Sequence, residues 1–167
     1  AWIDAHFDEQ TRFLQELVRV PTDTPPGNNA PHADRLAELL KPMGFEAEKF
    51  PVPSEEVKAY GLESLTNLIV RRKYGAGKTI ALNAHGDVVP PGEGWTKDPY
   101  GAEIADGKMY GRATAVSKCD MSTFTFAVRA LESLGASLKG NVELHFTYDE
   151  EYGGEKGPGW LLAKGHT

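Results

Sequence analysis

Two short segments with strand-like patterns, the nearly all apolar residues 79–84 and the residues 142–148, constrain the fold more than any other feature of this sequence. Runs of this length are typical of strands within a sheet, and the composition of 79–84 predicts a strand that is buried on both faces. Apolar residues recur at helical spacing in the segments around them, over residues 3–20, 31–43 and 118–134. Helices that alternate with buried strands predict an α/β fold, with a mixed, mostly parallel sheet sandwiched by helices.

The segments between these elements have weaker patterns. Residues 45–52 and 67–73 predict two further strands, the second of which is joined to 79–84 by a glycine-containing turn. Residues 53–64 are polar and predict irregular structure, and the glycine-rich residues 153–159 predict a loop.

Composition excludes several classes of protein. The formal net charge is −6, which argues against a nucleic-acid partner and against attraction to an anionic membrane. No apolar run approaches the roughly 18 residues that span a bilayer. Cys119 is the single cysteine, so an intrachain disulfide and a cysteine-based zinc site are both excluded, and a cytoplasmic location is expected.

A polar cluster follows each of the two apolar strands. His85-Gly86-Asp87 comes after the first strand, and Asp149-Glu150-Glu151 comes after the second. Sites in open α/β sheets form beyond the carboxyl ends of strands, so the clusters are expected to converge. An imidazole with several carboxylates suits zinc, and a carboxylate near a ligating histidine can hold its second ring nitrogen. The alternatives are a His-x-Asp without a metal and an acidic run at a solvated strand end.

An ordered set of motifs resembles the signature of the co-catalytic zinc aminoacylases and exopeptidases, which include acetylornithine deacetylase, succinyl-diaminopimelate desuccinylase and dipeptidases. The motifs are Ala84–Pro90, Gly92, Gly94-Trp95, Asp98–Tyr100, Asp106–Arg112 and Asp149–Gly154. The resemblance implies a zinc-exopeptidase-like (phosphorylase/hydrolase-like) domain. It also implies a metallopeptidase or deacetylase that hydrolyses amide bonds in N-acyl amino acids or small peptides, with a small molecule or short peptide as its partner.

The resemblance also implies roles for the matched residues. His85 would ligate one zinc ion, Asp87 would orient His85, and Glu151 would ligate the other zinc ion. Glu150 would be the general base that takes a proton from the attacking water. The expected cofactor is zinc, as one or two ions, with cobalt or manganese as substitutes.

One position departs from the family pattern. Aligning on Arg112 and Lys118 places Val116 where the family has an aspartate that bridges both metals. Asp120, one helical turn later, is expected to take over that role at least in part. The opposing interpretation is a capping box with Ser117 as its N-cap. Val116 therefore keeps a second hypothesis open, in which the protein is a non-catalytic or mononuclear relative that binds a small ligand in the same cleft.

The length is the second departure. Residues 1–167 are expected to form the N-terminal part of a single catalytic domain, incomplete at its C-terminus and inactive alone, without the family's lid domain. That lid commonly mediates dimerisation, so a homodimer is one expected state of the full-length protein. Among the remaining histidines, His6 and His32 are expected on the surface, and His145 is expected in the core with its polar atoms satisfied.

Overall fold

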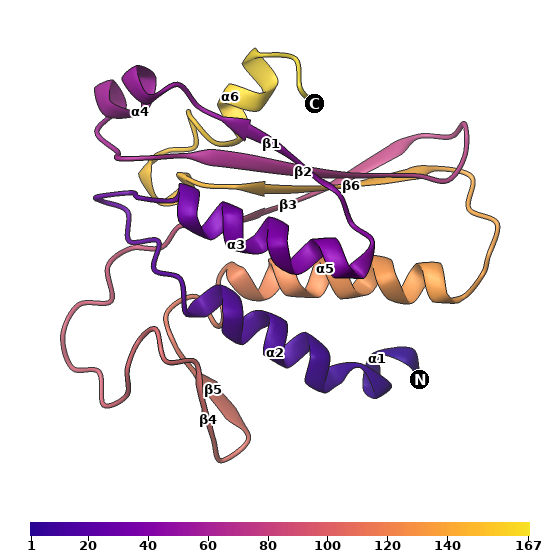
Figure 1. Ribbon diagram of the computed structural model, residues 1–167, viewed down its shortest axis with the longest axis horizontal. Helices are drawn as coiled ribbons and strands as arrows, with labels where there is room; N and C mark the ends of the chain where they lie inside the picture. The colour runs from indigo at the N-terminus through magenta and orange to yellow at the C-terminus, as the bar shows by residue number, and fades with distance from the viewer.

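A computed structural model describes residues 1–167, and its centre is a four-stranded sheet with the order β1-β2-β6-β3 (Figure 1). A separate two-stranded hairpin, β4-β5, projects away from the sheet. The strands are β1 (Ala47–Pro51), β2 (Thr66–Lys73), β3 (Thr79–His85), β4 (Glu103–Ala105), β5 (Lys108–Tyr110) and β6 (Asn141–Thr147). The helices are α1 (Trp2–Ala5), α2 (Phe7–Val18), α3 (Ala30–Leu40), η1 (Lys41–Met43), α4 (Ser54–Tyr60), α5 (Lys118–Ser133), η2 (Glu150–Tyr152) and α6 (Pro158–Ala163).

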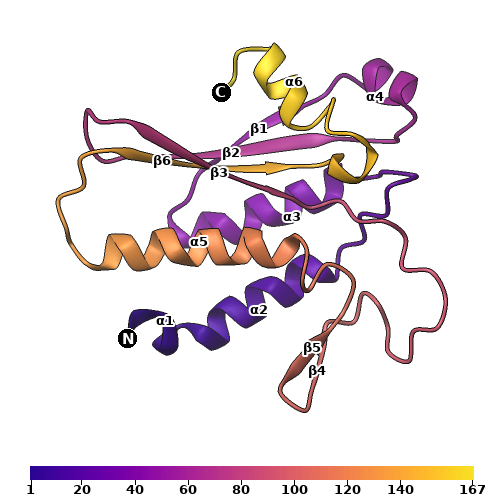
Figure 2. The same ribbon diagram turned by 180° about the vertical axis from the view of Figure 1, so that it is seen from behind.

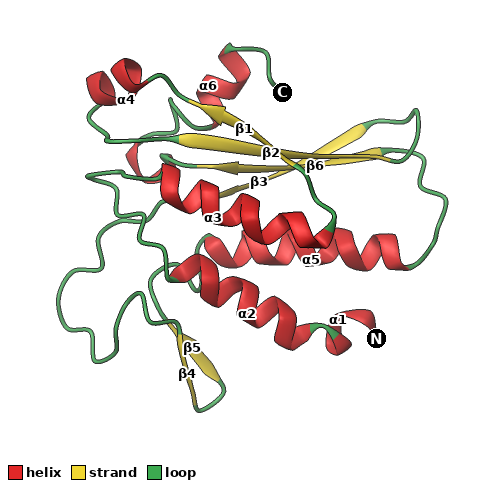
Figure 3. Ribbon diagram, in the orientation of Figure 1, coloured by secondary structure: helices red, strands yellow, loops and turns green.

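Helices lie on both sides of the sheet, as expected. In both views α2, α3 and α5 lie on one side and the short α4 and α6 on the other (Figures 1 and 2). Colouring by secondary structure shows the layers, with α3 and α5 directly beneath the strands (Figure 3). Between α3, α5 and the sheet lie fully buried apolar side chains, among them Leu36, Leu68, Met121, Leu144 and Phe146. Burial of this apolar surface is the main force that holds the layers together. No helix is both long and apolar enough to cross a membrane.

The strand pairing confirms a mixed sheet but corrects its expected details. β3 pairs with β6 in parallel, through the crossover helix α5, whereas β2 pairs antiparallel with both β1 and β6. The prediction of a mostly parallel sheet is therefore wrong for these residues. β2 and β3 run in opposite directions because a short turn joins them, and β6 lies between them, so any strand there must be antiparallel to one of the two.

The expected burial of β3 on both faces is also wrong. β3 is an edge strand of this sheet, most of its residues are exposed, and Ile80 retains 62% of its accessible surface. An apolar composition shows that a strand prefers burial, but it does not show what covers the strand.

Two short helices replace predicted irregular structure. Residues 54–60 form α4 where irregular structure was expected, and α6 (158–163) begins within the last two residues of the loop predicted over 153–159. Each helix is under two turns long, too short for a periodic apolar pattern to show in the sequence. The predicted first helix is divided at His6 into α1 and α2.

Candidate metal centre

The two polar clusters meet at one end of the sheet. His85 is the last residue of β3 and lies opposite Thr147, the last residue of β6. Because the two strands are parallel neighbours, the residues that follow them leave the sheet at the same edge. The turn after β3 carries Asp87, and η2 after β6 carries Glu150 and Glu151. The expected convergence of the clusters is confirmed.

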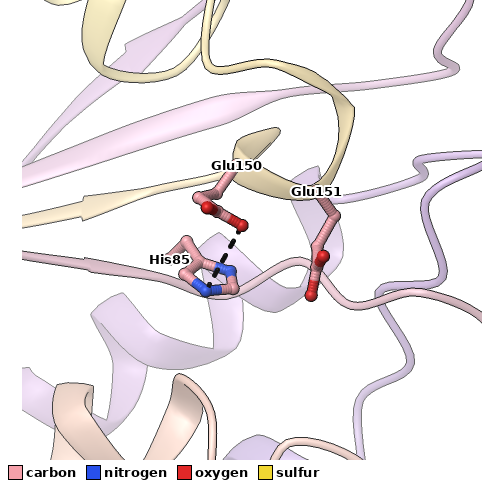
Figure 4. A group of neighbouring side chains, drawn as sticks. All are labelled: His85, Glu150 and Glu151. Carbon is pink, nitrogen blue, oxygen red and sulfur yellow. Dashed lines mark ion pairs between the residues drawn. The ribbon is translucent and has the colours of Figure 1, made fainter.

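His85, Glu150 and Glu151 point toward one another across this edge (Figure 4). One ligand atom from each lies within 4.8 Å of the others, and His85 Nε2 is 3.8 Å from Glu150 Oε2. The His85 side chain is only 12% exposed, whereas that of Glu150 is 61% exposed. A nitrogen and two carboxylates at this spacing fit a divalent transition metal such as zinc, with an open side toward solvent.

Asp87 connects the two turns beneath this group. Its side chain is fully buried, and its Oδ2 accepts a hydrogen bond of 3.0 Å from the Glu151 backbone N–H. Its Oδ1 has no hydrogen-bond partner at ordinary distance and faces His85 Nδ1 at 3.4 Å. His85 Nδ1 also lies 3.0 Å from the Asp87 carbonyl oxygen. The Nδ1 atom of His85 therefore makes its polar contacts with Asp87. The Nε2 atom faces Glu150 and is available to bind a metal.

The electrostatics of this pair favour an ionised carboxylate. Burial alone would raise the pKa of Asp87, but the neighbouring His85 and the backbone N–H groups of Asp149 and Glu151 lower that pKa below its usual value. Burial would lower the pKa of His85, but Asp87 and Glu150 outweigh it and raise that pKa. Asp87 is thus a fixed buried anion that orients the imidazole.

Asp149 has a structural role that the sequence analysis did not assign. It is fully buried, its Oδ1 accepts from the Gly157 N–H at 2.9 Å, and its Oδ2 accepts from the Lys156 N–H at 2.6 Å. Burial raises the pKa of Asp149 to about 6 although both hydrogen bonds oppose the shift. A Cβ atom at Gly157 would lie 2.4 Å from Asp149 Oδ1, so only glycine fits there. Asp149 therefore holds the loop that aims Glu150 and Glu151.

Asp120 is not brought into the His85–Glu150–Glu151 group. Its Oδ2 accepts a hydrogen bond of 2.7 Å from Ser117 Oγ, and its backbone N–H donates to the Ser117 carbonyl at 3.0 Å. The Ser117 side chain makes no capping bond to the helix backbone. The role of Asp120 as a metal ligand stays a prediction. The hydrogen bond from Ser117 argues against it, because it engages the Asp120 carboxylate locally. Val116 is 62% exposed.

The expectation for His32 is wrong, because this residue is fully buried. Its Nδ1 lies 2.8 Å from the Tyr148 hydroxyl, on the face of α3 that packs against the sheet. Burial, followed by the positive charge of Lys118, lowers the pKa of His32 well below its usual value. His145 is buried as predicted, with Nε2 2.9 Å from Glu143 Oε2.

Comparison with known proteins places this geometry in a family. Residues 81–167, more than half of the chain, match the model of peptidase family M20/M25/M40. The chain is 33% identical over 159 residues to succinyl-diaminopimelate desuccinylase from Rhodospirillum centenum, a match that covers 92% of this chain and 39% of that protein. The corresponding enzyme from Methylobacterium radiotolerans is 36% identical over 146 residues, covering 86% of this chain and 35% of the relative.

Solved structures share the fold. An M20 family metallo-carboxypeptidase from Sulfolobus solfataricus superposes with a TM-score of 0.74 at 24% identity, covering 88% of this chain and 32% of that chain. Human carnosine dipeptidase 1 superposes with a TM-score of 0.70 at 25% identity, covering 92% and 34% respectively. This chain thus spans about two fifths of the length of the curated relatives it matches. Because the family model matches residues 81–167, and the ordered motifs and the fold agree with that match, the chain belongs to peptidase family M20/M25/M40.

Proposed function

We propose that the complete protein is a metal-dependent hydrolase that cleaves amide bonds in N-acyl amino acids or short peptides. The observation that carries the proposal is the convergence of His85, Glu150 and Glu151 ligand atoms within 4.8 Å. The names of the relatives agree with this class, since they include desuccinylases, a carboxypeptidase and a dipeptidase. Zinc is the proposed metal, as one or two ions, with cobalt or manganese as substitutes.

Each residue of the group has a proposed task. His85 binds metal through Nε2, in an orientation set by Asp87, and Glu151 binds through its carboxylate. A bound divalent metal supplies Lewis acidity, which polarises a carbonyl and lowers the pKa of water. Glu150 is the general base, which takes a proton from the attacking water and passes it to the leaving amine. Its side chain is exposed, so water and substrate have access to the carboxylate.

The ligand set within residues 1–167 is small for a catalytic metal. A catalytic zinc usually has three protein ligands, and His85 and Glu151 are only two if Glu150 remains the base. We therefore propose that these residues are the N-terminal part of a single catalytic domain. The rest of the protein would add further ligands, the remaining sheet and a lid that can form a dimer. Residues 1–167 alone would then bind metal weakly and show no turnover.

A second candidate is a mononuclear or non-catalytic relative that binds a small ligand in this cleft. Val116 favours it, because the resemblance places a bridging aspartate at this position and valine cannot bind a metal. The bond from Ser117 to Asp120 favours it as well, since that carboxylate is already engaged locally.

Metal analysis and a substrate screen of the complete protein separate the two candidates. We expect at least one equivalent of zinc, and metal-dependent hydrolysis of an N-acetyl or N-succinyl amino acid or of a dipeptide. Chelation should abolish the activity, and zinc or cobalt should restore it. Stoichiometric metal without hydrolysis of any compound in the screen would favour the second candidate. Absence of both metal binding and hydrolysis would reject the proposal.

A further inference from the structure

A segment far from the metal group in sequence holds the turn that carries it. Residues 20–24, here called the N-terminal clamp, follow α2 and lie against the turn of residues 86–88. The Thr22 hydroxyl lies 2.6 Å from the Gly86 carbonyl oxygen, and the Val88 N–H donates to the Thr22 carbonyl at 3.1 Å. The Thr24 N–H donates to the Val88 carbonyl at 2.8 Å. The clamp therefore pairs with the turn as a short added strand would.

The Thr22 hydroxyl has one chemical option in this contact. A carbonyl oxygen only accepts, so the hydroxyl must be the donor. Thr22 is fully buried, so water cannot replace the bond if the hydroxyl is removed. The carbonyl of Gly86 would then be left without this donor, in the peptide group that directly precedes Asp87.

Gly86 is also closely packed against α5 and the residues at the end of β6. Its N–H donates to the Thr147 carbonyl at 2.9 Å. A Cβ atom at Gly86 would lie 2.5 Å from a ring carbon of Tyr148 and 2.8 Å from the terminal methyl of Met121. The turn is thus held on one side by β6, Tyr148 and α5, and on the other side by the clamp. His85 and Asp87 flank Gly86, so the orientation of both depends on this peptide.

The clamp is itself anchored at both ends. The buried amino group of Lys118 donates to the Val20 carbonyl at 2.8 Å. The Tyr100 hydroxyl, from the long loop before β4, is hydrogen-bonded to the Asp23 carboxylate. Because these bonds tie residues 20–24 to α5 and to the long loop, the clamp can restrain the position of the turn of residues 86–88.

We propose that Thr22 is a positioning residue of the metal site, which fixes the His85–Asp87 turn through its hydrogen bond to the Gly86 carbonyl. The inference rests on the proposed function of His85 as a metal ligand. Thr22 does not touch the metal or the substrate. It restricts the orientations of the His85 imidazole and the Asp87 carboxylate. Replacing a residue that orients a metal ligand in this way typically lowers metal affinity by about 10–100-fold.

The test compares three variants of the complete protein. Thr22→Val removes the hydroxyl and keeps the shape, and Thr22→Ser keeps the hydroxyl. Thr125→Val is the matched control, because Thr125 is also fully buried and its hydroxyl donates to the Met121 carbonyl at 2.7 Å, within α5. Cobalt(II) is titrated into each metal-free protein and followed by its visible absorption. Amide hydrogen exchange of the metal-free proteins and their melting temperatures are measured alongside.

We expect Thr22→Val to bind cobalt(II) about tenfold more weakly than the wild type and Thr22→Ser to stay within about twofold. Thr125→Val, which also removes a buried hydroxyl, should leave the cobalt affinity unchanged. The Val88 amide should exchange faster in Thr22→Val alone. Equal cobalt affinity and equal Val88 exchange in the two valine variants would overturn the proposal, as would a serine variant no better than the valine one. If the wild type binds no cobalt, the proposed metal site has failed, and the exchange of Val88 still decides whether Thr22 holds the turn.

Discussion

The two turns that form the metal group are built in different ways. The turn after β3 is buried and held from several sides, by Thr22, by Thr147 and by the ring of Tyr148. The turn after β6 is held by the Asp149 carboxylate and by the Asp87 carboxylate of the first turn, and its Glu150 side chain is 61% exposed. The imidazole thus extends from a packed turn, whereas Glu150 is exposed on the other turn. We expect the packed turn to lower the entropic cost of placing the imidazole ligand, and the exposed Glu150 carboxylate to be accessible for proton transfer with water.

Replacing the exposed carboxylate should have the largest effect. We expect Glu150→Gln in the complete protein to lower turnover by about 10²–10⁴-fold while metal content stays near that of the wild type, because glutamine keeps the shape but cannot take a proton. Steady-state kinetics and elemental analysis measure the two effects. Glu155→Gln, an exposed glutamate in the same loop, is the control and should change neither. Loss of metal in Glu150→Gln would instead make Glu150 a ligand and break the division between the two turns.

The buried carboxylate should matter for affinity rather than for proton transfer. We expect Asp87→Asn to weaken metal binding by about 10–100-fold, because the variant loses the charge that orients His85 and tethers the Glu151 backbone. Competition with a chromophoric chelator measures the affinity. Asp98→Asn is the control, since Asp98 also accepts a backbone N–H, from Tyr100 at 2.8 Å, outside the group. If Asp87→Asn binds metal as tightly as the wild type, the negative charge of Asp87 is not needed to orient His85 for metal binding.

The stability of the folded protein should depend on pH through His32, which is buried beside Tyr148. His32 is neutral in the folded protein because burial depresses its pKa, whereas in the unfolded chain it titrates near 6.5. The unfolded state therefore binds more protons below about pH 6.5. The stability that depends on His32 is present above that pH and is lost as the pH falls toward the depressed folded pKa, by up to about 1.4 kcal/mol per pH unit.

Urea unfolding of the metal-free protein at pH 7.5 and pH 5.5 measures this dependence. His32→Gln should lose less stability between the two pH values than the wild type does, and His6→Gln should behave like the wild type. The raised pKa of His85 acts in the opposite direction, giving stability that is lost as the pH rises through its folded pKa, and it is common to all three proteins. An identical pH dependence in His32→Gln would mean that His32 does not remain neutral.

Asp120 should give the smallest effect if it acts only locally. Its bond from Ser117 predicts that Asp120→Asn costs less than about 1 kcal/mol of stability, because the asparagine oxygen can still accept this bond, with metal content unchanged. Thermal melting and elemental analysis of the complete protein check this. Loss of about one metal ion per chain would establish the bridging role instead, and would add a third ligand-bearing segment to the two turns.

The sequence by itself determined the α/β class, the longer helices and strands, and the meeting of His85 with Glu150 and Glu151. These features follow from local periodicity and from the rule that parallel neighbouring strands end at the same edge. The helix predicted over 118–134 and the strand predicted over 142–148 appear as α5 and β6, each within a residue of its expected bounds.

Only the tertiary structure decided which surfaces are covered and which distant groups meet. It placed β6 between β2 and β3, left Ile80 exposed on an edge strand, and buried His32 against Tyr148. It also brought Thr22 to the Gly86 carbonyl across 64 residues of sequence. The physical reason is that burial and hydrogen-bond partners depend on long-range packing, whereas the sequence pattern of a strand or helix records only that one of its faces is apolar.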